Sequence, residues 1–517
     1  GKETVQIYVN SPYTQYDIDN KIEKASASLV GFEKTDILAP GASETVTIVV
    51  DGDYVASYDA YGAGTYIMDA GDYLFTAATD SHNAVNNFLA AKGQTPETNT
   101  KMDAAGNAAL VCTWNNPELD TTTYATSDAG VKIENQLNSS DPNMNKEVGQ
   151  TIQFLTRNDW SGTMPSIEKT VKIMLNAYLI DGLQGTQYDP ADYEAIDMPT
   201  LGAKNGLKLY DMIGLAYDDP KWDLLLDQLT VEEMVAVIND GAYNTAEIAS
   251  ISKPVTSDPD GPQGFTSLMG STGNCAYCSE YLMAQTWNQE LMYEMGVMIG
   301  EEALASGYNG WYAPAMNTHR SPFAGRNFEY YSEDGVLGGK LAAATVSGAA
   351  SKGCYAYIKH YALNDMESYR TSHVCTWATE QAIREIYLKP FELAIKDSAN
   401  ELKYIADAEG TVATKTISGC TAVMSSFNYI GNTWAGGHNG LCTGILRDEW
   451  GFEGFVITDF NLYDYMHKNQ GIYAGTDHML TYSAWSGEIP DTSSPTAVLA
   501  MRNSIKNILP GLFITQN

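Results

Sequence analysis

The strongest constraint on the fold is a regular alternation of short apolar runs and helical patterns over residues 221–517. The runs NGWYAPAMN, GCYAYIKHYAL, TAVMSSFN, EGFVITDF and GIYAGTD are each predicted to form a short buried strand. Between them lie segments such as ATEQAIREIYLKPFELAIKDSA, whose apolar residues recur at helical spacing. This alternation predicts an α/β domain with a parallel sheet, and a (β/α)8-type TIM barrel fits it best.

The barrel region is expected to open with the helical pattern WDLLLDQLTVEEMVAVIND, in which Thr230 and Glu233 offer a capping box. Residues 1–90 instead predict a β-sandwich. Apolar and polar residues alternate over residues 4–9 and 45–50, and GDYLFTAAT (71–79) adds another strand. Because the chain begins inside a strand, we expect the first strands of this sandwich to lie upstream.

Residues 91–220 are rich in Asn, Thr, Asp and Gly and show little periodicity. Short helices are conceivable there, for example in SIEKTVKIMLNAYLIDG. A long stretch of this kind is typical of a connector, so we expect a linker that wraps the next domain.

The net charge of −34 disfavours nucleic acid and anionic membrane as partners. We find no apolar run long enough to cross a bilayer, and the opening GKETVQIYVN lacks the pattern of a signal peptide, which leaves the compartment undetermined. The seven cysteines do not form a disulfide framework pattern. Cys275 and Cys278 form a lone CxxC, for which free thiols are a better interpretation than a metal site.

Charged side chains follow several of the predicted strands. They are Asp260 in DPDGPQGF, Arg326 in SPFAGRNFEYYSED, Lys359 and His360 in CYAYIKH, Arg370 in YALNDMESYR, and Asp459 in GFVITDF. In a barrel these strand ends converge on one face, where active sites lie. Cations around a carboxylate favour its charged form, so we expect Asp459 to be ionised and suited to act as a nucleophile.

Each of these side chains also has a purely structural interpretation. The alternatives are a helix cap for Asp459, a turn for Asp260, a solvated strand edge for Lys359 and His360, and a surface ion pair of Arg326 with Glu329 or Glu333. The repetition argues against them, because separate strand ends carry charge where a buried parallel sheet would avoid it.

The motifs GRNFEYYSED, KHYALNDMESYR, MSSFN, ILRDEWGFEGFVITDF and AGTD resemble, in order and approximate spacing, those of glycoside hydrolase family 3. The opening VQIYVNSP and LVGFEKTDILAPGASETVTI resemble that family's fibronectin type III-like domain from its middle onward. With this domain first and the barrel last, the chain resembles the circularly permuted branch, in which an α/β sandwich comes first.

The resemblance implies a retaining β-glycosidase that needs no cofactor or metal and acts on β-glucosides. Asp459 matches the nucleophile that forms the glycosyl-enzyme. The residues that match those holding the sugar in the first subsite are Asp260, Arg326, Lys359, His360 and Arg370. The Asp in DGP resembles the glucosidase type, and β-xylosidase or dual activity is the alternative. KHYALND lacks the Pro-Gly-His segment of the family's N-acetylglucosaminidases.

Two residues depart from the family pattern. Phe460 follows the nucleophile where the family usually has Trp, which gives the sugar a smaller platform. Phe427 stands where the family often has a Tyr that donates to the nucleophile. Both departures bear on the substrate and on the turnover.

A retaining glycosidase needs a second carboxyl group, roughly 5–5.5 Å from the first. The family's glucosidases take this acid/base from the α/β sandwich, and we recognise no such segment here. Glu329 and Glu367 match scaffold residues. We therefore expect the acid/base to lie outside this chain, on a second chain or on a missing N-terminal part.

Two further function classes remain open. The chain could be a non-catalytic carbohydrate-binding protein on a barrel scaffold, since a fold does not fix a function. It could also be a structural module of a larger complex, which would have no pocket at the strand ends. A binding protein has no need for a buried nucleophile, so Asp459 favours an enzyme.

Overall fold

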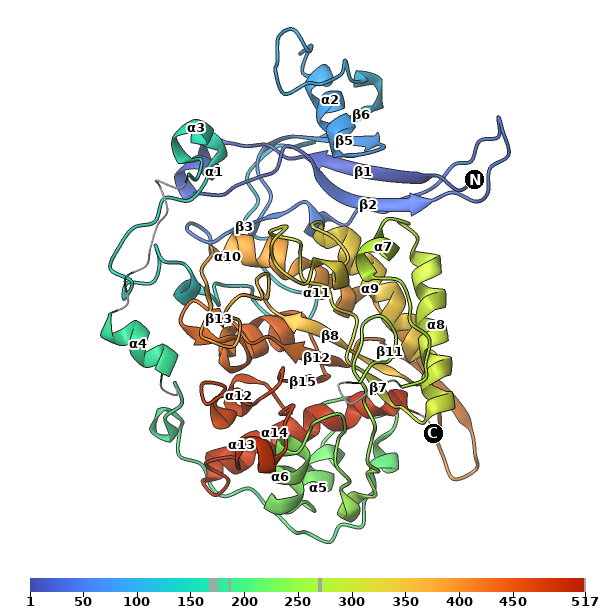
Figure 1. Ribbon diagram of the computed structural model, residues 1–517, viewed down its shortest axis with the longest axis vertical. Coiled ribbons are helices and arrows are strands. Elements are labelled where there is room, and N and C mark those ends of the chain that lie inside the picture. The colour runs from blue at the N-terminus through green and yellow to red at the C-terminus, as the bar shows by residue number, and fades with distance from the viewer. Residues whose placement is uncertain (167–173, 175, 185–186, 268–271, 516–517) are drawn as a thin grey trace.

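The computed structural model describes residues 1–166, 174, 176–184, 187–267 and 272–515. Figure 1 shows a β-rich layer, in blue, at one end of the molecule and an α/β body below it. The first layer holds β1 (Thr4–Asn10), α1 (Gln15–Asn20), β2 (Ser28–Lys34), β3 (Ser57–Asp59), β4 (Thr65–Ile67), β5 (Gly71–Ala78), α2 (Ser81–Ala91) and β6 (Val111–Asn116).

The N-terminal layer is built on an antiparallel sheet with strand order β2-β1-β5-β6, and β3 and β4 pair as a separate ribbon. The strands expected at residues 4–9 and 71–79 are confirmed as β1 and β5. Strand β6 extends the sheet from inside the segment that we expected to be a linker.

The strand expected at residues 45–50 is wrong, because no regular structure forms there. The alternation of half-buried and exposed side chains persists, and Ile48 packs against the sheet. A Cβ added to Gly31 of β2 would lie 2.7 Å from the Ile48 side chain. Alternating apolar and polar residues indicate burial of one face of a segment. A strand also needs hydrogen bonds to a neighbouring backbone, and this segment forms no such pairing with the sheet.

In its described residues, the segment between β6 and the α/β body forms two short α-helices, α3 (Trp160–Thr163) and α4 (Ala177–Gln184), and several short 3-10 turns. Figure 1 shows it running along one side of the molecule. About half of the helix expected in SIEKTVKIMLNAYLIDG falls on residues 167–173 and 175, outside the described residues, and α4 covers its end.

The α/β body is centred on a parallel sheet with order β15-β12-β8-β7. Its strands are β7 (Gly310–Trp311), β8 (Tyr355–Tyr361), β12 (Ala422–Ser425) and β15 (Phe455–Ile457). Single backbone contacts continue it, to Asp260 beside β7 and to His478 beside β15. A closed eight-stranded barrel is not seen over the described ranges, so only the parallel α/β part of the expectation is confirmed.

Helices cover this sheet and alternate with its strands. They are α5 (Lys221–Leu226), α6 (Val231–Asn239), α7 (Glu280–Ala284), α8 (Gln289–Ser306), α9 (Gly335–Ala350), α10 (Glu380–Ala382), α11 (Lys389–Asp397), α12 (Lys468–Ala474), α13 (Ser483–Ser486) and α14 (Pro495–Gly511). Helices α8 and α9 cross closely at two glycines, since a Cβ on Gly296 or Gly348 would lie 2.1 Å from a carbonyl oxygen of the other helix. The remaining strands are β9 (Cys375–Thr376), β10 (Ala399–Ile405), β11 (Val412–Ser418), β13 (Tyr429–Ile430) and β14 (Thr433–Trp434).

The capping box expected at Thr230 and Glu233 is confirmed at the start of α6. The strand expected in GIYAGTD is wrong, because these residues end helix α12. Gly475 stops the helix in the left-handed conformation, with φ of 104°, and its N–H caps the last carbonyls. The three apolar residues were too few to separate a strand from a helix, and the chain rejoins the sheet only at His478.

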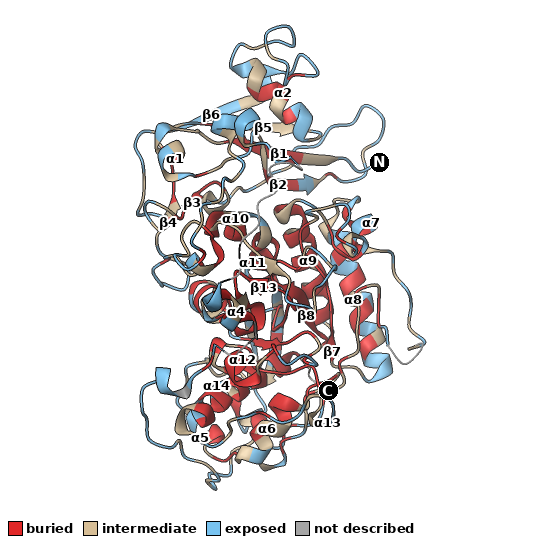
Figure 2. Ribbon diagram, turned by 60° about the vertical axis from the view of Figure 1, so that its left-hand side comes forward, coloured by how far each residue is buried: buried red, intermediate tan, exposed pale blue. Residues whose placement is uncertain are grey.

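The two layers share one apolar core. Tyr8, Leu29 and Phe32 of the N-terminal sheet belong to the same buried cluster as α8, α9 and α11, and Phe32 meets Trp287 edge-on at 5.2 Å between ring centroids. Figure 2 shows the buried residues concentrated around β8 and α9. None of the helices in the described parts of the chain is long and apolar enough to span a membrane.

Candidate active site

Asp459 stands directly after β15, on a backbone held by its neighbours. Its N–H donates to the carbonyl of Ser425 at 3.0 Å, and its Oδ1 accepts the N–H of Phe460 at 2.8 Å. Its Oδ2 is buried and accepts no hydrogen bond from the described residues. Asp459 caps no helix, so the carboxylate presents one uncommitted oxygen on a rigid platform.

His360, at the end of β8, lies beside this oxygen. Its Nε2 is 3.7 Å from Asp459 Oδ2 and 3.2 Å from a guanidinium nitrogen of Arg326, and its Nδ1 is 3.3 Å from the hydroxyl of Tyr330. Burial, helped by the charges of Arg326, Lys359 and Arg370, lowers the pKa of His360 well below its usual value. The imidazole is therefore neutral, and the guanidinium donates to Nε2, which places the ring proton on Nδ1.

Lys359 and Asp260 form an ion pair at 2.9 Å at the same face. The lysine side chain is 4% exposed and the aspartate side chain 30%. Asp260 also accepts the N–H of Gly261 at 2.9 Å. Its partial exposure leaves carboxylate surface for a ligand.

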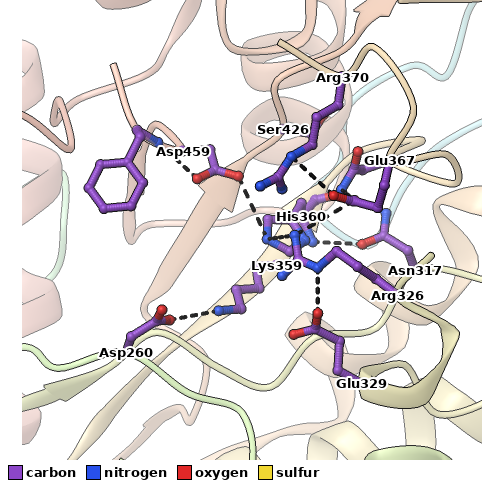
Figure 3. Close-up of polar contacts among 12 residues, drawn as sticks. Asp260, Asn317, Arg326, Glu329, Lys359, His360, Glu367, Arg370, Ser426 and Asp459 are labelled. Carbon is purple, nitrogen blue, oxygen red and sulfur yellow. Dashed lines mark hydrogen bonds and ion pairs between the residues drawn. The ribbon is translucent and has the colours of Figure 1, made fainter. Parts of the chain in front are cut away.

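Two arginines complete the cluster, each steadied by a glutamate. Arg326 pairs with Glu329 and lies 3.8 Å from Glu367, and Arg370 pairs with Glu367 at 3.0 Å. The expected pair of Arg326 with Glu329 is thus present, but inside the site rather than on a surface. Nη1 of Arg370 is buried and has no hydrogen-bond partner among the described residues. Figure 3 shows the charged residues converging from separate strand ends.

The two phenylalanines that depart from the family pattern have local roles. The guanidinium of Arg370 lies 4.8 Å from the ring centroid of Phe427, in cation–π contact. Phe460 meets Tyr243 edge-on at 6.1 Å. Phe427 therefore positions a cation, and Phe460 forms part of an aromatic wall.

The charge state of Asp459 follows from two opposed effects. Burial raises the pKa of Asp459, while Arg370, Arg326, Lys359 and the Phe460 N–H lower it. The net shift is upward, so the cations offset burial only in part.

Three neutral residues also belong to this site. Sequence reasoning placed Asn364 after its strand without giving it a role, and it missed Asn317 and Tyr330. Asn317 exchanges two hydrogen bonds with the backbone of His360, at 2.8 and 2.9 Å. Tyr330 contacts the His360 ring, and Asn364 donates to Glu367 at 3.1 Å. Uncharged residues give no signal at a strand end, although Tyr330 and Asn364 lie inside the quoted motifs GRNFEYYSED and KHYALND.

Comparison with known proteins gives two family matches. Residues 228–481 match the model of the glycosyl hydrolase family 3 N terminal domain, and residues 3–81 match that of the fibronectin type III-like domain. The chain belongs to glycoside hydrolase family 3. The fibronectin-like domain precedes the family 3 domain, which fits the permuted arrangement.

Relatives of this family 3 chain include β-glucosidase A of Butyrivibrio fibrisolvens, 30% identical over 92% of this chain and 51% of that protein. A β-glucosidase of Ruminococcus albus is 29% identical over 89% of this chain and 42% of its own length. The chain thus spans about half the length of the curated relatives it matches.

Among solved structures, a β-glucosidase from Paenibacillus barengoltzii matches with a TM-score of 0.70 and 23% identity. The match covers 100% of this chain and 52% of that one. At this identity the likeness establishes a shared fold for both layers of the chain.

Proposed function

We propose that this family 3 chain carries the nucleophile half of a retaining β-glucosidase. The observation that carries the proposal is Asp459, whose buried Oδ2 has no hydrogen bond in the described structure and stands among Arg326, Lys359 and Arg370. A carboxylate with one anchored oxygen and one uncommitted oxygen is suited to attack an electrophilic carbon. The lysine, histidine and arginines suit the hydroxyl groups of a sugar.

In the proposed reaction, Asp459 attacks the anomeric carbon of a terminal β-D-glucosyl residue. A glycosyl ester forms as the bond to the leaving oxygen breaks, and that oxygen takes a proton from a carboxylic acid. Water, deprotonated by the same carboxylate, then cleaves the ester and frees glucose with retained configuration. Asp260, Arg326, Lys359, His360 and Arg370 hold the sugar during both steps.

We propose that the acid/base carboxyl comes from outside residues 1–517. Glu329 and Glu367 are each committed to an arginine, which suits a scaffold role. Exposed apolar side chains stand within three residues of the site residues along the chain: Phe323 (86%), Tyr369 (78%), Phe328 (55%), Leu462 (43%) and Met366 (37%). They offer a surface on which a further domain could close over the sugar.

We also propose the domain limits 1–90, 91–220 and 221–517. In this proposal the parallel strands of the last domain close into the family's barrel.

The test uses a 2-deoxy-2-fluoro-β-glucoside with a 2,4-dinitrophenolate leaving group. Such a leaving group needs no proton, so labelling requires the nucleophile but not the acid/base. The purified chain should gain one fluoroglucosyl group, located on Asp459 by peptide mass spectrometry, and Asp459→Asn should gain none. Labelling at another residue would overturn the assignment.

The origin of the acid/base is tested separately with an alkyl β-glucoside, whose leaving group must be protonated. The purified 517-residue chain should label with the activated reagent but fail to hydrolyse the alkyl glucoside. Hydrolysis at rates typical of glycosidases, by material that denaturing electrophoresis and intact mass show to be this chain alone, would place the acid/base within it.

The same preparation separates the alternatives. Parallel assays with aryl β-glucoside and aryl β-xyloside distinguish a glucosidase from a xylosidase or dual enzyme. A chain that binds glucose in a titration but labels with no activated glycoside would be a carbohydrate-binding protein instead.

A further inference from the structure

Three buried polar atoms around the candidate nucleophile have no hydrogen-bond partner within the described structure. They are the Asp459 Oδ2, the Arg370 Nη1 and the hydroxyl of Tyr243. An unpaired buried polar group is costly, so such atoms mark places where a ligand completes the network. Asp459 and Arg370 already have a role in the proposed function, whereas Tyr243 does not.

Tyr243 lies in the turn after α6, next to the sheet. Its backbone and its ring both contact neighbouring residues. Its N–H donates to the Tyr312 hydroxyl at 2.9 Å, and its carbonyl accepts the N–H of Asp258 at 2.9 Å. Its ring stacks on Tyr312, with centroids 5.7 Å apart, and meets Phe460 edge-on. Backbone and ring contacts therefore hold the hydroxyl in one position, and no described residue forms a hydrogen bond with it.

The surroundings of this hydroxyl identify the kind of group it can bind. Burial, and then the negative charges of Asp260 and Asp459, raise the pKa of the Tyr243 phenol, so the hydroxyl keeps its proton. The ring of Tyr243 contacts Tyr312, whose backbone pairs with Asp260, and Phe460, which directly follows Asp459. These contacts place the phenol, a hydrogen-bond donor, on the side of the site where both carboxylates lie. The complementary ligand group is a hydroxyl oxygen of a sugar bound by Asp260 and attacked by Asp459.

We propose that Tyr243 is a further substrate-binding residue, whose hydroxyl donates to a hydroxyl of the glucosyl unit between Asp260 and Asp459. The proposal rests on the proposed function and deepens it. Tyr243 and Phe460 together then form the aromatic wall that the smaller Phe460 alone would leave incomplete.

The test compares glucose binding by the wild-type chain and by Tyr243→Phe in calorimetric titrations. The variant keeps the ring and loses only the hydroxyl, so affinity for glucose should fall about tenfold, the worth of one hydrogen bond of about 1.4 kcal/mol. The 2-, 3-, 4- and 6-deoxyglucoses follow in the same titration. The sugar that lacks the contacted hydroxyl should bind equally to wild type and variant.

Tyr482→Phe is the matched control, because the Tyr482 hydroxyl already donates to the Ala242 carbonyl at 2.6 Å. It should lower the melting temperature and leave glucose affinity unchanged. Tyr243→Phe should instead keep the melting temperature, since it breaks no hydrogen bond within the protein. If Tyr243→Phe binds glucose and every deoxyglucose within twofold of wild type, the inference is overturned.

The outcomes also separate this inference from the proposed function. A wild-type chain that neither binds glucose nor labels at Asp459 would overturn both. A wild type that does both, with an unaffected Tyr243→Phe, would overturn the role of Tyr243 alone.

Discussion

Nε2 of His360 lies 3.7 Å from Oδ2 of Asp459, at a distance where an ion pair would be expected, yet the two atoms are both acceptors. The imidazole is neutral because it is buried among cations, and its Nε2 accepts from Arg326. The gap between the two acceptors suits a donor from outside, such as a sugar hydroxyl. His360 therefore orients Arg326 and helps to shape the site without supplying charge.

This arrangement predicts how labelling of Asp459 depends on pH. With the activated fluoroglucoside, the rate should show no inflection near pH 6.5, because His360 does not titrate there. The rate should fall only at acidic pH, as Asp459 becomes protonated with a pKa above 3.8. His360→Ala should lower the rate at least about tenfold, since Arg326 loses its acceptor, and should keep the profile. An inflection near 6.5 that disappears in the variant would contradict this account.

The pair Lys359–Asp260 should behave as one unit in a double-mutant cycle. Asp260→Asn leaves a buried ammonium without its counter-charge, and Lys359→Met frees a partly exposed carboxylate. Each single change should weaken glucose binding, and the double variant should lose less than the sum, with a coupling of about 1–2 kcal/mol. Calorimetric titration with glucose measures the affinity of the wild type, the two single variants and the double variant. Strict additivity would show that the two groups act independently.

Glu385 should make the junction between the layers sensitive to pH. Its carboxylate accepts the N–H of Tyr58 at 2.5 Å, and burial raises the pKa of Glu385 to about 7. Because the folded pKa exceeds the reference value of 4.5, this group favours folding below pH 4.5, and that contribution is lost as pH rises to 7. Glu385→Gln mimics the neutral form, so its stability relative to wild type should be about 3 kcal/mol higher at pH 8 than at pH 4.5. Urea unfolding at both pH values measures this, and an equal difference at both would refute it.

The buried pair Arg384–Glu449 should be costly to break. The guanidinium donates twice to Glu449, at 2.6 and 3.0 Å, and once to Glu380 at 2.9 Å, with the Arg384 side chain only 2% exposed. Glu449→Ala leaves a buried charge short of its partner, so the free energy of unfolding should drop by about 3–5 kcal/mol. The exposed pair Lys352–Glu301 supplies the control, and Glu301→Ala should cost under about 1 kcal/mol. Equal losses in the two variants would argue against the role of burial.

Much of the candidate site was predictable from the sequence because strand ends are easy to recognise. A buried run such as Phe455–Ile457 followed by a carboxylate is visible in one dimension, and parallel strands bring such ends together. The six predicted residues accordingly meet in one cluster. These residues also lie within the motifs that resemble those of the family, and the resemblance gave each residue a role to test.

The rest depended on tertiary contacts that have no local signature. Tyr243 follows a helix in a turn, and only its tertiary contacts with Tyr312 and Phe460 connect it to the site. Ile48 alternates as in a strand, but no neighbouring backbone pairs with its segment. The end of α12 was mistaken for a strand because a glycine such as Gly475 can follow a helix or a strand, so in the sequence it does not distinguish the two.

The shared core of the two layers constrains how this chain could change in evolution. Phe32 of β2 and Trp287 of the α/β body cover one another, and Lys34 donates to the Thr286 carbonyl at 2.7 Å. Losing or exchanging the fibronectin-like layer would bare apolar surface that supports α8 and α9. Because the two layers share this buried core, we expect them to unfold together.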